Sequence, residues 1–169
     1  MPTRRASPVS LRDGARRHAG EAAHKRFVIV ASQFNPSITR ALVRGATGVL
    51  HRAGVPSRQI RLVWVPGAFE LPVVAARLAA GRPRPHAIIA LGAILRGQTP
   101  QYAVLGHAVA QSLSQVAVST LIPVTFGVIV ATSLAQARAR VGGTTGNRGA
   151  EAALAALAVL RLFDRLERR

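Results

Sequence analysis

Short apolar runs alternate with longer segments of helical periodicity along most of the chain. Four runs are almost wholly apolar, as expected of strands buried on both faces. They cover residues 27–32, 60–65, 86–95 and 122–131. Apolar residues recur at helical spacing in the segments 35–54, 69–81, 100–120, 133–143 and 147–169. This alternation predicts an α/β fold, a three-layer sandwich in which helices flank a four-stranded parallel sheet.

Capping residues mark the ends of several predicted helices. Asn35 is a common N-cap residue, Pro36 suits a first helical turn, and Gly54 suits the position after a last turn. Pro72 falls in the first turns of the next helix, where proline is tolerated. The segment 133–143 ends in two glycines, and we expect a short helix that continues up to them.

The first part of the chain differs from the rest in composition. Residues 1–26 hold seven basic and two acidic residues and show no apolar period. They also lack the apolar stretch of a secretory signal. We therefore expect a basic, flexible arm over residues 1–26 and a single domain over residues 27–169. Because no run is long and apolar enough to span a bilayer, we expect a cytoplasmic protein without a membrane partner.

The overall charge is strongly positive. The chain has 23 basic and six acidic residues, which gives a formal net charge of +17. Such a charge predicts attraction to polyanions, including non-specific nucleic-acid binding at low salt. Aromatic residues make up only 4% of the chain and do not alternate with the arginines. A protein dedicated to reading nucleic acid is therefore not expected.

Acidic residues and metal ligands are scarce in the domain body. Glu70 is the only carboxylate between residues 22 and 150, which argues against paired-carboxylate catalysis and carboxylate metal sites there. Cysteine is absent, and the five histidines show no metal-binding spacing. We therefore expect neither a metal nor a thiol nucleophile, and no cofactor.

Candidate chemistry lies where the predicted strands end, because sites in parallel sheets lie beyond the carboxyl ends of the strands. The four exits read SQFN, VPGAFE, RGQTPQ and VIVATS. In the second exit, Gly67 and Ala68 let a ligand approach the backbone, and Glu70 stands at a helix start where the helix dipole favours its charge. In the third, residues 97–99 precede a helix whose first amides can hold an anion.

Five motifs in fixed order resemble one enzyme family. SQFN, WVPGAFELP, ALGAILRGQTP, IPVTFGV and GNRGAEAALAAL together resemble 6,7-dimethyl-8-ribityllumazine synthases over about residues 27–163. The resemblance implies a flavodoxin-like sandwich of the lumazine synthase type. It implies a transferase of riboflavin biosynthesis that condenses 5-amino-6-(D-ribitylamino)uracil with 3,4-dihydroxy-2-butanone 4-phosphate.

The resemblance also assigns site residues. Phe34 stacks on the pyrimidine, Asn35 binds substrate besides capping a helix, and Glu70 accepts hydrogen bonds from ribityl hydroxyls. The other substrate-binding residues are Gly67, Ala68, Ile94, Leu95 and Phe126. The phosphate-binding residues are Gly97, Gln98, Thr99, Arg140 and Arg148. Of these, Arg140 comes from a neighbouring subunit, and Arg148 stands where the family carries lysine.

The chain departs from the family at the proton-transfer position. Gln101 occupies the place of the family's histidine, and Ala103 that of the aspartate beside it. Glutamine forms hydrogen bonds but cannot titrate, so we expect a weakened catalytic position. His107 lies six residues further along the same predicted helix, on a different side. It is therefore not assigned as a substitute base.

Three functions remain compatible with these residues. The first is a lumazine synthase that works at a reduced rate without the histidine. The second is a non-catalytic or altered homologue that binds flavin-like ligands, and the third is an oligomeric shell or scaffold whose basic arm binds nucleic acid. We favour the first, because the phosphate and ribityl residues are kept. The resemblance further implies a homopentamer, with decamers and icosahedral shells as larger assemblies.

Overall fold

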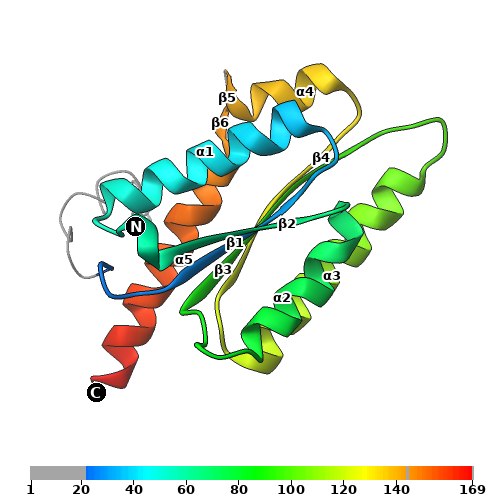
Figure 1. Ribbon diagram of the computed structural model, residues 1–169. Coiled ribbons are helices and arrows are strands. Elements are labelled where there is room, and N and C mark those ends of the chain that lie inside the picture. The colour runs from blue at the N-terminus through cyan, green and yellow to red at the C-terminus, as the bar shows by residue number, and fades with distance from the viewer. Residues whose placement is uncertain (1–21, 144, 169) are drawn as a thin grey trace, which may run out of the picture.

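The computed structural model describes residues 22–143 and 145–168, so most of the predicted arm lies outside the described residues. Strands and helices alternate as predicted (Figure 1). The strands of the main sheet are β1 (Phe27–Ser32), β2 (Ile60–Val65), β3 (Ala87–Leu95) and β4 (Val124–Ala131). The α-helices are α1 (Pro36–Arg52), α2 (Leu71–Ala79), α3 (Gln101–Thr120), α4 (Leu134–Ala139) and α5 (Arg148–Glu167). Two single 3₁₀ turns, η1 (Ser57–Gln59) and η2 (Ala68–Glu70), flank β2.

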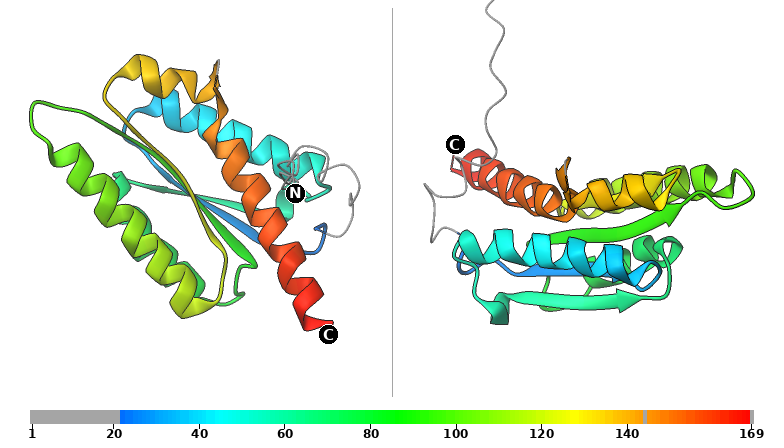
Figure 2. Two further views of the ribbon diagram at one scale, coloured as in Figure 1. Left: turned by 180° about the vertical axis from the view of Figure 1, so that it is seen from behind. Right: turned by 90° about the horizontal axis from the view of Figure 1, so that it is seen from above.

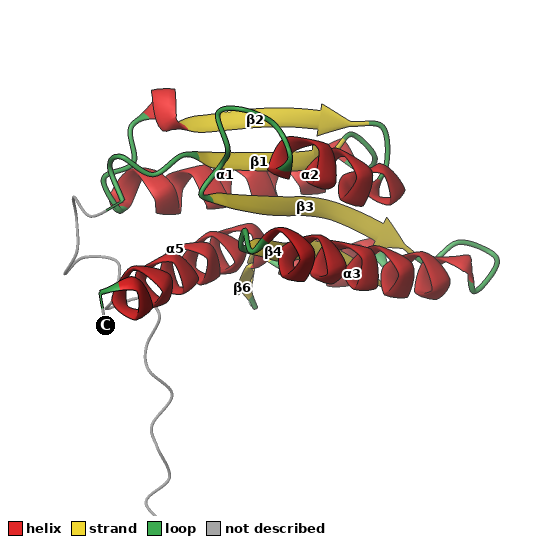
Figure 3. Cartoon of the chain, turned by 90° about the horizontal axis from the view of Figure 1, so that it is seen from below, coloured by secondary structure: helices red, strands yellow, loops and turns green. Residues whose placement is uncertain are grey.

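The main sheet is parallel throughout, with the strand order β2-β1-β3-β4. Helices α1, α4 and α5 cover one face, and α2 and α3 cover the other (Figures 2 and 3). The predicted α/β sandwich with a four-stranded parallel sheet is therefore confirmed. No helix in the described part of the chain is both long and apolar enough to cross a membrane.

Each face of the sheet has its own apolar core, which explains why the strands read as unbroken apolar runs. Along β1, Ile29 points into the core beneath α1 and α5, and Val30 points into the core beneath α2 and α3. Both side chains are fully buried. Leu42 of α1 and Leu71 of α2 fill the two cores from the helix side.

A glycine allows α1 and α5 to pack closely. A Cβ atom built on Gly149, at the start of α5, would lie 2.2 Å from the backbone oxygen of Leu42. Real Cβ atoms do not approach a carbonyl oxygen so closely, so any side chain at residue 149 would push the two helices apart.

The segment 133–143 corrects the sequence prediction. Helix α4 ends at Ala139, and the chain then forms a small antiparallel hairpin from β5 (Val141–Gly143) and β6 (Gly146–Asn147). Gly142 and Gly146 adopt φ angles of 113° and 88°, which a right-handed helix does not allow. The predicted helix over residues 140–143 is therefore wrong.

Candidate active site

The sheet has a switch point between its two central strands. From β1 the chain moves outward to β2, whereas from β3 it moves outward in the opposite direction to β4. Ligands of parallel sheets bind in the crevice that such a reversal leaves beyond the carboxyl ends of the strands. The site predicted from the sequence therefore centres on the ends of β1 and β3.

Unequal strand lengths form a step at this point. The pairing of β1 with β3 ends where Ala31 lies opposite Leu91, whereas β3 continues beside β4 until Leu95 lies opposite Ala131. The last residues of β3 thus have no strand partner on their β1 side. Backbone polar groups left in this way need another partner.

Asn35 supplies that partner. Its side-chain Nδ2 donates a hydrogen bond of 3.2 Å to the backbone oxygen of Ala93. Asn35 has a left-handed backbone (φ 55°, ψ 59°), and its side chain makes no capping hydrogen bond to α1. Asn35 thus occupies the predicted N-cap position, where its backbone oxygen accepts from the Ile38 and Thr39 N–H groups. Its side chain does not cap the helix, and the amide instead fixes the turn after β1 against the exposed end of β3.

Phe34, Gly67 and Glu70 lie together beyond β1 and β2. Phe34 is 71% exposed, although it lies just after a buried strand. The Glu70 carboxylate accepts a hydrogen bond of 2.8 Å from the Gly67 N–H. A Cβ atom at residue 67 would lie 2.9 Å from this carboxylate and 3.7 Å from the Phe34 ring. Because residue 67 has no side chain, the Glu70 carboxylate and the exposed Phe34 can lie next to each other.

Three further predicted residues line the step. Ala68 is half-buried in η2, and its Cβ lies 3.6 Å from where a Cβ of Gly92 would stand. At the end of β3, Ile94 is buried in the core beneath α2 and α3, whereas the half-buried Leu95 packs on the other face of the sheet. The structure therefore brings these residues to the same end of the sheet as Phe34 and Glu70.

The loop before α3 is open to solvent. Residues 96–101 are all exposed, and this includes the predicted phosphate-binding residues Gly97, Gln98 and Thr99. The first turn of α3 has no side-chain cap and no acidic residue. Its first amides lack partners within the helix, apart from the Ala103 N–H, which donates to the Pro100 oxygen. Gln101 is the first residue of α3.

Arg140 and Arg148 lie together, but on the opposite face of the sheet from α3. The Arg148 N–H donates a hydrogen bond of 2.8 Å to the Arg140 oxygen, across the base of the β5–β6 hairpin. The Arg148 guanidinium forms a 2.8 Å ion pair with Glu151. Because α4 and α5 pack on the α1 side of the sheet and α3 packs on the other, Arg140 and Arg148 belong to elements of a different face from the start of α3.

Phe126 is also separate from the other predicted residues within one chain. It pairs in register with Ala90, four residues before Ile94, or about 13 Å along a strand. Its side chain is 39% exposed on the edge strand β4. Because directly paired residues of neighbouring strands point to the same face, the ring lies on the same face of the sheet as Ala90, the face that α2 and α3 cover, and at a distance from the step.

Comparison with known proteins identifies the family. A sequence model of 6,7-dimethyl-8-ribityllumazine synthases matches residues 24–164. A 6,7-dimethyl-8-ribityllumazine synthase of Gemmatimonas aurantiaca is 46% identical over 141 residues, which cover 83% of this chain and 85% of that protein. Those of Prosthecochloris aestuarii and Leuconostoc mesenteroides are 43% and 39% identical, and cover 86% and 85% of this chain and 94% and 92% of their own lengths.

The chain belongs to the 6,7-dimethyl-8-ribityllumazine synthase family. This confirms the family suggested by the five motifs. It also assigns to the chain the role of an enzyme, a lumazine synthase of riboflavin biosynthesis.

Sequence reasoning missed two features of this candidate site. The first is the Ala93 carbonyl, which Asn35 binds; the greater length of the third apolar run was the available indication. The second is Ser32, a fully buried residue whose hydroxyl has no hydrogen-bond partner among the described residues. A Cβ at Gly92 would lie 3.1 Å from this hydroxyl, so the absence of a side chain at residue 92 makes room for it.

Proposed function

We propose that the lumazine synthase reaction takes place at the step between β1 and β3, at a rate reduced by Gln101. The supporting observation is the juxtaposition of the open Phe34 ring with the Glu70 carboxylate, which the Gly67 N–H holds in place. An aromatic face and an acceptor beside it suit a planar pyrimidine that carries a hydroxylated side chain.

The pyrimidine substrate stacks on Phe34 in this proposal. Its ribityl hydroxyls donate to Glu70, and the small residues Gly67 and Ala68 let it approach the backbone. Ile94 and Leu95 form the wall on the β3 side. Asn35 holds the turn in position and presents its remaining hydrogen-bonding capacity to the ligand.

In this proposal, the phosphate group of the four-carbon substrate binds at the start of α3. Residues 97–99 and the open amides of the first turn form an anion site at a helix N-terminus. Arg140 and Arg148 of a neighbouring copy complete it with positive charge, since one chain keeps them on the other face of the sheet. Phe126 of a neighbouring copy closes the pyrimidine pocket in the same way.

Alignment supplies most of the catalysis in this proposal. An amine and a ketone condense without an enzyme nucleophile, and holding two reactants in place can contribute roughly 7–11 kcal/mol to the rate. A positioned proton carrier adds about 10²–10⁴-fold. Gln101 cannot serve as that carrier, so water moves the protons and the reaction is slow.

A steady-state assay combined with ligand binding tests this function. We expect slow formation of the lumazine product, and binding of a non-reactive pyrimidine analogue that Glu70→Ala weakens about tenfold or more. Binding without turnover would instead support an altered homologue that holds flavin-like ligands. If the protein shows neither binding nor turnover, the result would instead support the oligomeric scaffold as its function.

We infer that the working unit is a homopentamer, from which decamers or shells can assemble. Leu121, at the end of α3, is 78% exposed and has a positive φ of 56°, which is unusual for leucine. With Val118 and Phe163 it borders an apolar hollow of about 390 Å³ beside the edge strand β4. Exposed apolar surface of this kind suits contact with another copy.

Nucleic-acid binding and the cytoplasmic location of the protein remain predictions. The net charge of +17 favours non-specific binding of nucleic acid, which should weaken steeply as salt is added. The expected cytoplasmic location fits an enzyme that takes small phosphorylated substrates. Neither property is needed for the reaction proposed at the step.

A further inference from the structure

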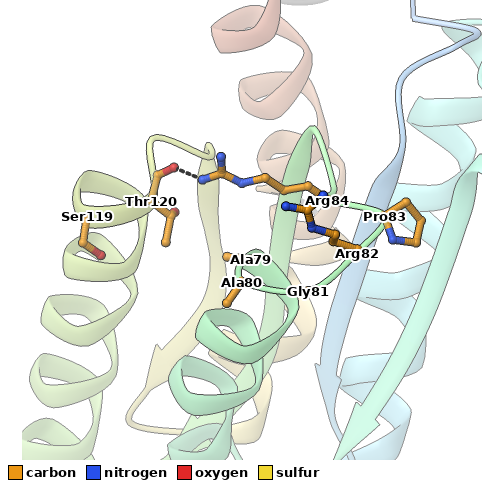
Figure 4. Close-up of a pocket in the computed structure, with 8 residues that line it drawn as sticks. All are labelled: Ala79, Ala80, Gly81, Arg82, Pro83, Arg84, Ser119 and Thr120. Atoms are coloured by element: carbon orange, nitrogen blue, oxygen red, sulfur yellow. Dashed lines mark hydrogen bonds between the residues drawn. The ribbon is translucent and has the colours of Figure 1, made fainter.

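A second hollow lies at the end of the molecule opposite the candidate active site. It has a volume of about 680 Å³ and opens between the last turns of α2 and α3 and the loop that leads to β3 (Figure 4). Because the helices run antiparallel to the strands, these helix ends lie at the amino ends of the strands. The hollow is therefore separate from the step between β1 and β3.

Hydrogen bonds hold the loop beside this hollow in place. The Arg26 guanidinium donates two bonds, of 3.1 and 2.8 Å, to the backbone oxygen of Arg84. The Arg84 guanidinium in turn donates to the backbone oxygen of Thr120, at the end of α3. This chain of contacts joins the start of β1 to the end of α3, so the position of Arg84 is set before any ligand arrives.

The hollow carries positive charge without a counter-ion. Arg82 and Arg84 both line it, and their side chains extend in the same direction from the loop (Figure 4). No carboxylate lines the hollow, and Arg82 has no hydrogen bond or ion pair to any described residue. Two guanidinium groups with free donors favour an anion, and above all a phosphate, which a guanidinium can bind through two parallel bonds.

The opposite wall presents acceptors. Of the last carbonyl oxygens of α2 and α3, that of Leu78 accepts from the Gly81 N–H and that of Thr120 from Arg84. The Ser119 and Thr120 hydroxyls donate to the Val116 oxygen, so at the hollow their oxygens can only accept. Capping of a helix end explains why Arg84 binds the Thr120 oxygen. It does not explain Arg82 or the size of the hollow, which lies within the range of small-ligand sites.

We propose that this hollow binds a small phosphorylated molecule that also carries hydroxyl groups, such as a sugar phosphate or a nucleotide. Arg82 and Arg84 hold the phosphate, and the oxygens at the ends of α2 and α3 accept from the hydroxyls. The site goes beyond the lumazine synthase reaction and contributes no group to it.

Calorimetric titration of the full chain with ribose 5-phosphate tests the proposal, with ribose and inorganic phosphate as the comparison ligands. We expect ribose 5-phosphate to bind more tightly than phosphate, and ribose alone not to bind. Arg82→Ala should weaken binding about tenfold, as for the loss of one charge-assisted contact. Because Arg82 makes no hydrogen bond or ion pair within residues 22–143 and 145–168, this variant should keep the loop intact.

Two controls separate the hollow from other sources of phosphate binding. Arg40→Ala removes the same charge from an exposed position on α1 and should leave binding unchanged. Thr99→Ala tests the loop before α3, which the proposed function assigns to the substrate phosphate, whereas Arg82→Ala should leave turnover unchanged. Equal weakening by Arg40→Ala, or loss of binding only with Thr99→Ala, would overturn the proposal. So would binding of a single-stranded RNA at Arg82 without binding of ribose 5-phosphate.

Discussion

At the scale of single residues, the proposed function makes Gln101 the residue that limits the rate of the enzyme. Gln101→His should raise kcat by about tenfold or more, because a positioned acid–base group typically contributes about 10²–10⁴-fold. KM should change less, since Gln101 is exposed at the start of α3 and the binding residues stay in place. Steady-state kinetics of the variant and the parent measure both parameters.

The neighbouring Ala103 and a distant glutamine complete this test. Ala103→Asp should raise the rate further when it is combined with Gln101→His, because it restores the partner that orients the histidine. Gln111→His places a histidine at an exposed position further along α3 and should have no effect. If kcat of both the single and the double variant equals that of the parent, proton transfer does not limit the rate of this enzyme.

His86 makes stability depend on pH. Its Nδ1 accepts a hydrogen bond of 2.8 Å from the Arg26 N–H, and burial, with the charges of Arg26 and Lys25 nearby, lowers the pKa of His86 below its ordinary value of 6.5. The unfolded chain therefore binds this proton more readily than the folded chain does. Stability from His86 is fully present above pH 6.5 and is lost as the pH falls below that value towards the lowered pKa.

Denaturant unfolding between pH 7.5 and 5 measures this effect. His86→Asn keeps an acceptor near the position of Nδ1 but cannot titrate, so its stability should fall less over this range than that of the parent. The difference between the two slopes isolates His86 from the other histidines. Identical slopes would show that His86 does not take up a proton differently on unfolding.

At the scale of elements, the contact between α1 and α5 depends on the lack of a side chain at Gly149. Gly149→Ala would place a methyl group 2.2 Å from the Leu42 oxygen, and the helices must separate. We expect a loss of about 2 kcal/mol or more in the free energy of unfolding. Gly48→Ala is the matched control, because its methyl would meet only the flexible end of Arg52 at 3.3 Å. It should stabilise α1 by up to about 1 kcal/mol, and equal losses in both variants would argue against the close contact.

The elements were predictable from the sequence where their pattern is local. Buried strands read as apolar runs and helices as periodic stripes, so the order of elements and the parallel sheet followed directly. The β5–β6 hairpin was missed because Gly142 and Gly143 fit a helix end as well as a turn. The exposure of Phe34 was predictable from the sequence. The hydrogen bond from Asn35 to the Ala93 oxygen was not, because it depends on how far β3 extends beyond the end of β1. In the proposed function, Phe126 and Arg140 act on a neighbouring copy of the chain, and a pattern within one chain does not show such a contact.

At the scale of the whole molecule, Leu121 tests the proposed assembly. Leu121→Asp puts a charge into the apolar surface beside β4, and aspartate tolerates the positive φ of 56° better than leucine does. We expect the folded chain to sediment mainly as smaller species. Ser57→Asp, at an exposed position in η1, should sediment like the parent. A stable monomer of the parent at micromolar concentration would contradict the pentamer itself.

The ion pair between Lys25 and Asp164, at 2.6 Å, ties the start of β1 to the last turns of α5. Both described ends of the chain therefore leave the domain close together, at the amino ends of the strands and away from the step. Partner proteins can be fused genetically to either end without covering the site. A short linker between the ends would also allow a circular permutant that begins in an exposed loop and keeps the same catalytic surface.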